Sequence, residues 1–423
     1  MKSQNLHLVI IGGGIAGPAL ALLLKKAGMS STVYEAHPRL ENLGGGITIA
    51  PNGMNVLEEV GVADLIASNG ALVSEFCFRD HRGKVLARYR AGNVEKYRWP
   101  SVAISRTTLH RILMEEVARQ GIQVEYRKRL KQVTTIDGER IVAVFEDGTT
   151  AQGDFLVGAD GVHSRVRQII FPTAPSPSYL GVLGVGGFAA PSVVMAADAA
   201  DRKSLNFSLG CAGQFGYCNS RQNEDGWMWW CHLPQDIELT SPELAAIPDE
   251  ELRKKLLERY KGWHEPIGTF LANTPEIIRT NIYEAPPLPA WHKDRVVLIG
   301  DAAHAMSPSG GQGASLALED AMYLVKLLRQ FFGEFEAVFA EFERARRTRA
   351  AKISAWAYQN ETRQQTELRP LGCWVRDRML SVVLPLFGAR SLDWMYSYRV
   401  NWNEPVRAQD DRTGSLMPGA TAG

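Results

Sequence analysis

Apolar and polar positions at the start of the chain predict a βαβ unit. Residues 6–11 (LHLVII) are mostly apolar and lack strict alternation, which is typical of a buried parallel strand. Glycines at positions 12–14 interrupt the run, and Ile15 to Ala27 then has helical spacing that ends at Gly28. Residues 31–35 (STVYE) predict a second strand. The pattern therefore indicates a parallel α/β layer at the N-terminus.

The middle of the chain has a different pattern. Residues 76–90 predict a hairpin turned at Arg82-Gly83, and the stretch 204–234 is rich in aromatic residues with few helix signals. Leu205, Phe207 and Leu209 would share one strand face. In the next strand two sets of side chains alternate: Trp227, Trp229 and Cys231 on one face, and Met228, Trp230 and His232 on the other. We expect an antiparallel sheet that forms a separate layer.

The end of the chain returns to the first pattern. Residues 295–300 (RVVLIG) again predict a buried parallel strand, and a helical stretch from about 314 to 366 breaks at Gly333. We therefore predict an α/β domain made of residues 1–75, 100–172 and 281–365. It would be interleaved with a mostly antiparallel β domain of residues 76–99 and 173–280, and followed by C-terminal helices and a polar tail (366–423). In the first domain, Thr107 and Thr108 would cap a helix that runs to Gln120.

Composition narrows the classes of function. The 423 residues carry 47 Lys and Arg against 46 Asp and Glu, so there is no basic excess to attract nucleic acid. Five cysteines without a Cys-x-x-Cys pair argue against a zinc module, predict no metal, and suggest reduced thiols in the cytoplasm. The uncharged run from Val9 to Leu24 is shorter than the about 20 apolar residues of a membrane span, and glycines and a proline interrupt it.

The first motif is Gly12-x-Gly14-x-x-Gly17, which opens a helix directly after a strand. Glycines here turn the chain and let the backbone, with Ile15 and Ala16, approach a pyrophosphate at the helix N-terminus. Glu35 ends the next strand, near the spacing expected for an acid that accepts hydrogen bonds from ribose hydroxyls. The motif predicts a dinucleotide site and does not by itself separate NAD from FAD.

Two later motifs extend this site. The second runs from Asp154 to Arg167 (DFLVGADGVHSRVR), and the third begins at Arg295 (RVVLIGDAAHAMSPSGGQGA). In the third, Asp301 follows the strand end at Gly300, and N–H groups around Gly313 could face an anionic ring edge. Two nucleotide-contacting strand ends far apart in sequence imply one long cofactor laid across a single domain.

These three motifs, in this order, resemble the flavoprotein monooxygenases of the para-hydroxybenzoate hydroxylase type, the single-component FAD aromatic hydroxylases. That family pairs the dinucleotide fingerprint with DxLVGADGxxSxVR and RVxLxGDAAHxxxPxxGQGxNxAxEDA, and the resemblance covers residues 6 to about 350. It implies a Rossmann-like FAD-binding domain interleaved with the β substrate domain. Ala36, where an arginine is frequent, and Ser315, where asparagine is usual, depart from the pattern.

The resemblance also assigns residues by position. Glu35 would bind the adenosine ribose, Asp301 the ribityl chain, and Asp160 would be linked to both FAD and the nicotinamide donor. The residues that would lie near the flavin ring are Arg106, Gly45, Gly46, Ile47, Pro308, Gly311, Gly313 and Ala314.

The implied activity is hydroxylation of an aromatic or polyketide-like small molecule. NAD(P)H would reduce FAD, O₂ would add at flavin C4a, and the hydroperoxide would deliver one oxygen atom inside a dry pocket. Tyr217 could orient a phenol and His232 could take its proton, although an ordinary sheet residue with satisfied hydrogen bonds is the more common case for both residue types. His304 is expected to bond locally. NADH or NADPH, the substrate, and a monomer or homodimer remain open.

Other interpretations remain alongside this one. A flavin-dependent reductase of isoprenoid double bonds shares the first motif, and a non-catalytic flavin- or drug-binding protein is a third interpretation.

The arginines at 344, 346, 347 and 349 are expected to form a solvated helix face paired with Glu341 and Glu343. The apolar stretch Met379 to Phe387 is expected to dock over the substrate domain; no membrane partner is predicted, and a peripheral membrane contact is the minority hypothesis.

Overall fold

A six-stranded sheet carries the N-terminal βαβ unit. The computed structural model describes residues 6–38, 44–136, 139–189, 200–220, 226–331, 333–365 and 368–406, with side chains except at 362–365. The strand order is β18-β19-β12-β1-β2-β8, in which β18–β19 is antiparallel and the other pairs are parallel. The strands are β1 His7–Ile11, β2 Ser30–Tyr34, β8 Gln123–Glu125, β12 Phe155–Gly158, β18 His292–Lys293 and β19 Val296–Leu298. The strand expected at residues 295–300 thus joins the first sheet.

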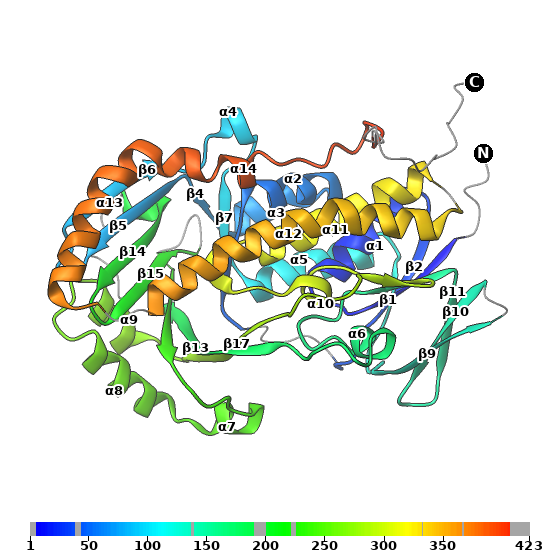
Figure 1. Cartoon of the computed structure of the whole chain (residues 1–423), viewed down its shortest axis with the longest axis horizontal. Coiled ribbons are helices and arrows are strands. Elements are labelled where there is room, and N and C mark those ends of the chain that lie inside the picture. Colours follow the sequence, from blue (N-terminus) through cyan, green and yellow to red (C-terminus); the bar gives the residue numbers. More distant parts are fainter. Residues whose placement is uncertain are drawn as a thin grey trace.

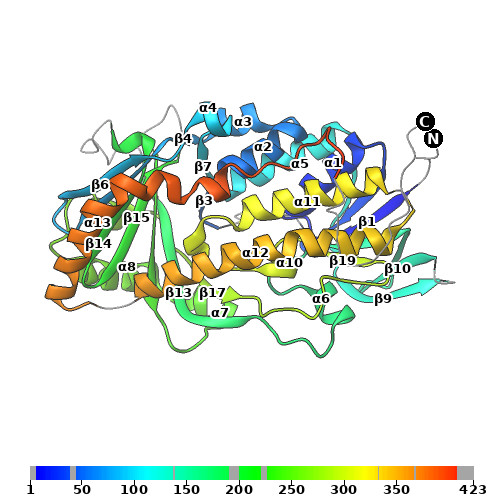
Figure 2. The ribbon, with the colours of Figure 1, turned by 45° about the horizontal axis from the view of Figure 1, so that its top comes forward.

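Helices from both ends of the sequence pack on this sheet. Every residue of α1 (Ala16–Lys26) up to Leu24 is buried, which explains the uncharged run near the N-terminus. The long helices α11 (Gly313–Gln330) and α12 (Phe335–Gln365) run side by side across the molecule (Figure 2). They are separated near Gly333, where the break was predicted. Among the described helices none is long and apolar enough to cross a membrane.

Smaller elements complete this layer. Two three-stranded sheets are formed by β3 (Gly46–Ile49), β4 (Ala71–Val73) and β7 (Ser101–Ser105), and by β9 (Leu130–Ile136), β10 (Arg140–Phe145) and β11 (Thr150–Gly153). The helices are α2 Pro51–Val60, α3 Ala63–Asn69, α4 Val94–Tyr97, α5 Arg106–Arg119, α6 Arg165–Ile170 and α10 Asp301–His304.

The start of α5 differs from the sequence expectation. Ser105, rather than Thr107 or Thr108, caps the helix, because its extended backbone ends β7 and its Oγ accepts the Thr108 N–H at 3.1 Å. The helix therefore begins at Arg106, one residue after the strand, and holds that arginine at the strand–helix junction.

The second layer is a seven-stranded sheet with the order β17-β13-β16-β15-β14-β5-β6. Its strands are β5 Glu75–Asp80, β6 Val85–Arg90, β13 Ser178–Ala189, β14 Ser204–Gly210, β15 Gly213–Asn219, β16 Trp227–Pro234 and β17 Ile278–Glu284. All pairs are antiparallel except β14–β5. The α/β fold with an interleaved, mostly antiparallel β layer and C-terminal helices is therefore confirmed, and Gly83 (φ +89°) turns the expected hairpin.

Helices cover the second sheet unevenly. One face packs on α8 (Asp249–Arg259) and α9 (Ile267–Asn273), with the short α7 (Ser241–Ala246) nearby. On the other side, α13 (Pro370–Ser391) lies along β5 and β6 and leads to α14 (Asp393–Tyr396) (Figure 1). A Cβ on Gly388 would lie 2.6 Å from the Tyr89 ring, so this glycine sets the close approach of α13 to β6.

The helix α13, which carries the apolar stretch Met379 to Phe387, lies on the second sheet as expected, yet most large apolar side chains of this helix face outward. The side chains between 45% and 73% exposed are Leu371, Trp374, Val375, Met379, Val382, Val383, Leu386 and Phe387. The contact with β6 uses the narrow side of the helix that carries Cys373 and Gly388, so the apolar run is not what the contact buries.

Candidate active site

The turn between β1 and α1 depends on two close backbone approaches. A Cβ on Gly12 (φ +112°) would lie 2.3 Å from the Ala159 carbonyl oxygen, and one on Gly17 would lie 2.0 Å from the Gly12 oxygen. A Cβ on Gly14, by contrast, would meet no described protein atom within 4 Å. The first turn of α1, entered through Ile15 and Ala16, therefore faces open space with N–H groups that lack intrahelical partners.

Glu35 and His110 stabilise this turn through hydrogen bonds to the N–H and the carbonyl of Gly13. Glu35 Oε2 accepts the Gly13 N–H at 2.7 Å, and Oε1 accepts the His37 N–H at 2.9 Å. His110 Nε2–H donates to the Gly13 carbonyl at 2.7 Å, and burial lowers the pKa of this imidazole. His110 was not predicted as a site residue from the sequence, because it lies on the buried face of α5 next to the apolar positions. Each Glu35 oxygen keeps a second lone pair that could accept a ribose hydroxyl.

The structure brings Arg106 next to the predicted glycine segment. Gly46 pairs with Ser105 and Ile47 with Ile104 across β3 and β7, and the Arg106 N–H donates to the Gly45 oxygen at 3.1 Å. Met228 of the second sheet fills the space in front of Gly46, where a Cβ would lie 2.0 Å from its sulfur. The two layers therefore meet directly at this segment.

The second and third motifs contact each other through a buried arginine. The Arg167 guanidinium donates to the Val162 oxygen at 2.5 Å and to the Ala302 oxygen at 2.9 Å. Asp160 accepts hydrogen bonds from Ser164 Oγ and from the Arg165 and Val166 N–H groups, so it organises the start of α6. Desolvation raises the pKa of the Asp160 carboxyl, although these hydrogen bonds oppose it.

The third motif ends at the N-terminus of α11. Gly300 (φ +58°) turns the chain after β19, and Asp301 begins α10 with an exposed side chain whose Oδ1 lies 3.8 Å from a Cβ placed on Gly313. Pro308 and Gly311 are also exposed, and Gly313 and Ala314 form the first turn of α11. The side chain of Asp301 thus lies beside helix N–H groups.

A buried charged cluster supports this loop from behind. Asp320 accepts hydrogen bonds from the Gly300 N–H at 3.0 Å and from His304 Nε2–H at 2.5 Å, and it pairs with Arg346 at 2.7 Å. Arg346 is 0% exposed and also binds Glu319 at 2.7 Å. Arg349, whose side chain is 10% exposed, pairs with Glu319 as well. The expectation of a solvated arginine face is therefore wrong for Arg346 and Arg349, because these carboxylates come from α11, which helical spacing within α12 does not reveal. Arg344 and Arg347 pair with Glu341 and Glu343 as expected. His304 bonds locally, as expected.

The residues around these loops fit FAD. Cβ atoms on Gly14, Gly45 and Gly311 would meet no described protein atom within 4 Å, so the backbone at each of these three turns is open to a ligand. The N-termini of α1 and α11 supply N–H donors suited to a pyrophosphate and to an anionic ring edge. The carboxylates of Glu35, at the first turn, and Asp301, beside the second N-terminus, have the chemistry to accept hydroxyl groups of such a cofactor.

The two faces of β16 have different neighbours. Trp227, Trp229 and Cys231 belong to the core shared with α8 and α9. Met228 and Trp230 face the first layer, where the half-buried ring of Trp230 lies 6.0 Å from Phe207, and Phe207 lies 5.2 Å from Phe78. The predicted alternation is confirmed, and it places an aromatic surface opposite the predicted flavin segment (Gly45–Ile47), which Met228 contacts at Gly46.

Tyr217 does not belong to this surface. It pairs with Trp229 across β15 and β16, so its side chain is on the α8–α9 side, where it is 0% exposed and packs 5.5 Å from Phe270. Burial raises the pKa of the Tyr217 hydroxyl, and Arg79 is its neighbour at 3.4 Å. The structure therefore does not support the candidate role of Tyr217 as a substrate-orienting hydroxyl, because strand alternation alone does not reveal which face turns to the cofactor.

His232 shares the flavin-facing side with Met228 and Trp230. Its Nδ1 lies 2.8 Å from Oε1 of Glu361, a 2% exposed residue of α12. The other carboxylate oxygen of Glu361 accepts a hydrogen bond from Ser307 Oγ at 2.6 Å and another from Ser309 Oγ. Burial would raise the pKa of Glu361, but His232 and the two serines outweigh it and lower the pKa to about 2. Glu361 was not found from the sequence, since it follows the last motif.

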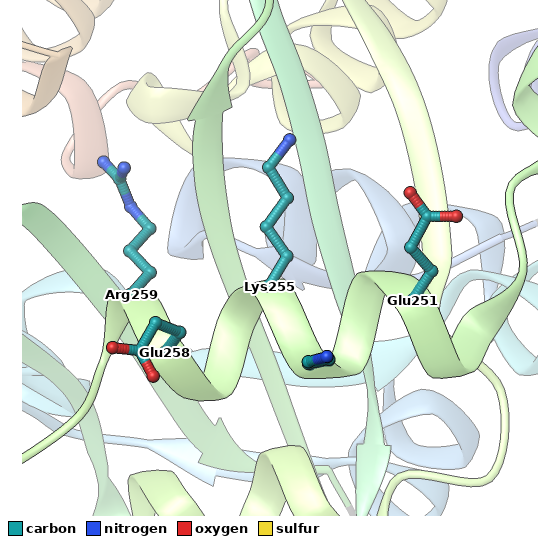
Figure 3. A pocket seen from close by; sticks show the side chains of 5 residues that line it. Glu251, Lys255, Glu258 and Arg259 are labelled. Carbon is teal, nitrogen blue, oxygen red and sulfur yellow. The ribbon is translucent and has the colours of Figure 1, made fainter.

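A surface hollow elsewhere is not part of this arrangement. It lies beside α8 and is lined by Glu251, Lys254, Lys255, Glu258 and Arg259 (Figure 3). Glu251, Lys255 and Arg259 project from one side of that helix, and α8 packs on the face of the second sheet that carries Trp229. The hollow is thus separated from the flavin loops by the whole sheet.

The fold and these loops define an FAD-binding oxidoreductase. A family model described as FAD binding domain matches residues 5–357, and the chain belongs to this family of FAD-dependent aromatic hydroxylases and monooxygenases.

The relatives bear this out. The chain is 30% identical over 386 residues to aurachin C monooxygenase/isomerase of Stigmatella aurantiaca, covering 90% of this chain and 94% of that protein. It is also 30% identical over 391 residues to 6-hydroxynicotinate 3-monooxygenase of Pseudomonas fluorescens, covering 89% and 96%. The protein is thus an FAD-dependent monooxygenase.

Solved structures share the fold. The Klebsiella pneumoniae HpxO complex with FAD and uric acid superposes with a TM-score of 0.80 at 24% identity, covering 93% of this chain and 96% of that one. A salicylate hydroxylase substrate complex gives a TM-score of 0.76 at 21% identity, covering 94% and 96%.

Proposed function

We propose that the protein uses NAD(P)H and O₂ to hydroxylate a hydroxyl-bearing aromatic or polyketide-like small molecule. The reaction would consume substrate, O₂, NAD(P)H and a proton, and would release hydroxylated product, NAD(P)⁺ and water. The observation that carries the proposal is the position of His232 on an aromatic sheet face, joined through Glu361 to the loop that borders the flavin. The names of relatives that act on hydroxylated rings support it.

The chain's own residues would perform four tasks. Glu35 and Asp301 bind the cofactor's hydroxyl groups, with Asp160 and Arg106 holding the loops around it. Backbone N–H groups of Gly313 and Ala314 stabilise negative charge at the ring edge. The rings of Trp230, Phe207 and Phe78 exclude water from the reacting centre. His232 takes the proton of the substrate hydroxyl and so makes the ring more nucleophilic. The bound flavin supplies hydride acceptance and O₂ activation.

The same face suggests an uncharged substrate. The positions of β5, β14 and β16 that share the face of Trp230 are occupied by Phe76, Phe78, Asp80, Leu205, Phe207, Leu209, Met228 and His232. None of these described positions holds a lysine or arginine that would pair with a substrate carboxylate. We therefore propose a preference for neutral phenols, hydroxyquinolines and polyketides over hydroxybenzoates.

The five free cysteines are consistent with a cytoplasmic setting, which we also propose.

Stopped-flow reduction of the bound flavin tests the proposal. NADPH and NADH would each be mixed with the holoenzyme without O₂, alone and with 4-hydroxyquinoline, salicylate, 3-hydroxybenzoate, 6-hydroxynicotinate or tetracycline. We expect a neutral compound to accelerate reduction, followed by uptake of one ¹⁸O atom into it under ¹⁸O₂. Fast reduction without any compound, or turnover without O₂ consumption, would instead indicate a reductase. Binding of a compound with neither reduction nor turnover would indicate a non-catalytic protein.

A further inference from the structure

The carboxylate of Glu361 joins two parts of the site that are distant in sequence. It belongs to the far end of α12, which reaches the second sheet and contacts β15 and β16. One oxygen contacts His232 of β16, and the other accepts hydrogen bonds from Ser307 and Ser309, which flank Pro308. Ser307 Oγ also accepts the Ser309 N–H at 3.2 Å. The Glu361 carboxylate therefore holds both residues that flank Pro308 through hydrogen bonds.

The ionised carboxylate of Glu361 determines which nitrogen of its neighbour His232 carries a proton. With a pKa of about 2, the carboxyl is ionised at neutral pH and can only accept hydrogen bonds. The 2.8 Å contact therefore requires a proton on His232 Nδ1. In the neutral imidazole the other nitrogen, Nε2, is then the proton acceptor. Among the described residues, none makes a hydrogen bond to this Nε2.

We propose that Glu361 is a positioning residue of the active site, which holds His232 in the Nδ1–H form with Nε2 free to accept a proton, and which ties this base to the flavin loop at Ser307–Ser309. The role rests on the proposed function of His232 as the base. Because one carboxylate contacts both, a shift of the loop around Pro308 would also move the imidazole.

Replacement by glutamine separates this role from simple space filling. In a Glu361→Gln variant the amide oxygen could still accept from the two serine hydroxyls, so the amide NH₂ would face His232 Nδ1. A donor there can pair only with an unprotonated Nδ1. The imidazole would switch to the Nε2–H form, which cannot accept the substrate proton. If Glu361 only filled space, the Glu361→Gln replacement, which keeps the size of the side chain, would leave the tautomer of His232 unchanged.

The first test needs no substrate. Long-range ¹H–¹⁵N NMR of the ¹⁵N-histidine-labelled holoenzyme reports the tautomer of each of the nine histidines, and a His232→Asn variant identifies the His232 signals. We expect the Nδ1–H form in the wild type and the Nε2–H form in Glu361→Gln. An Nε2–H tautomer in the wild type, or no change in the variant, would overturn the proposal. If Glu361→Gln does not fold, the wild-type spectrum still decides.

The second test is kinetic. For the best compound found with the wild type, kcat should fall by about 10–100-fold in Glu361→Gln while KM changes little, and Glu361→Asp should recover part of the loss. Glu343→Gln is the matched control, since Glu343 of the same helix holds His292 Nδ1 at 2.9 Å outside the site. Equal losses in both variants, or none in Glu361→Gln, would contradict the proposal. An inactive wild type would instead count against the proposed function, and the NMR result would still stand by itself.

Discussion

Met228 and Gly46 join the two layers at the predicted flavin segment (Gly45–Ile47), where the methionine sulfur lies only 2.0 Å from the position of a Cβ on Gly46. The contact leaves room for a glycine at position 46, one of the residues expected near the flavin ring, and no room for a larger side chain unless Met228 moves. A Gly46→Ala variant should displace Met228 and lower stability by about 1–3 kcal/mol, because extra volume in a filled contact forces side chains or backbone to move. Thermal unfolding of the apoprotein measures this loss of stability.

Gly45→Ala is the control for this variant. A Cβ at Gly45 would meet no described protein atom within 4 Å, so the apoprotein should keep its Tm while FAD binds more weakly. A Gly45→Ala variant that unfolds as early as Gly46→Ala would contradict the assignment of Gly45 to the cofactor side.

His110 should matter for FAD affinity. A His110→Leu variant leaves the Gly13 carbonyl without its 2.7 Å hydrogen bond, and an unpaired buried acceptor costs about 1–3 kcal/mol. Since about 1.4 kcal/mol is a factor of ten, the Kd of FAD should rise about tenfold, measured by flavin fluorescence on titration. His110→Gln retains a donor and should recover part of the affinity; no difference between the two variants would count against a role for this hydrogen bond.

Breaking the buried ion pair should be costly. Arg346→Leu leaves Glu319 and Asp320 buried with fewer partners, and such a loss costs about 3–5 kcal/mol. Arg344→Leu, two residues earlier with a 52% exposed side chain, should change stability by less than about 0.5 kcal/mol. Urea unfolding of both variants provides the comparison, and similar midpoints would show that the Arg346 pair is not needed for stability.

Glu361 should make stability depend on acid pH. Its pKa is lowered from 4.5 to about 2, so the stabilising contribution is present above about pH 4.5 and disappears as the pH falls through about 2. The shift corresponds to about 3 kcal/mol. The Tm difference between wild type and Glu361→Gln should therefore shrink on acidification from pH 5 towards pH 2; a constant difference would exclude a lowered pKa.

The inner and outer sides of α13 should respond differently to substitution. Gly388→Ala places a methyl group 2.6 Å from the Tyr89 ring and should lower the Tm. Val382→Thr, at a position 62% exposed, should leave the Tm within error. Differential scanning fluorimetry of both is sufficient, and an equal fall in Tm would mean that the exposed side of α13 is covered by a partner in solution.

The sequence predicted the parts of the site that depend on backbone geometry. Gly12, Gly17 and Gly300 are required by close approach or positive φ, and such needs leave a pattern in a single sequence. The first layer could likewise be predicted from apolar strand runs followed by helical spacing, and the second layer from the hairpin signal and the strand periodicity of its aromatic stretch. These features are local, so neighbouring residues record them.

Residues that depend on tertiary pairing could not be predicted. Glu361 meets His232 across 129 positions, and Arg346 meets Asp320 across the contact between α11 and α12. Tyr217 and His232 both looked like candidates, yet they lie on opposite faces of one sheet. Which face turns to the cofactor depends on how β16 sits against β3, and no local pattern records that arrangement.

The order of strands has a consequence for protein engineering. The chain leaves the first layer after β4 for the hairpin β5–β6, returns through β7, and leaves again for β13 to β17 before β18 and β19 complete the first sheet. Neither layer is a continuous piece of polypeptide, so a new substrate sheet cannot be grafted on as a cassette with two junctions. Exchange of specificity between relatives requires at least four crossover points, and point substitutions on the aromatic face are the shorter route.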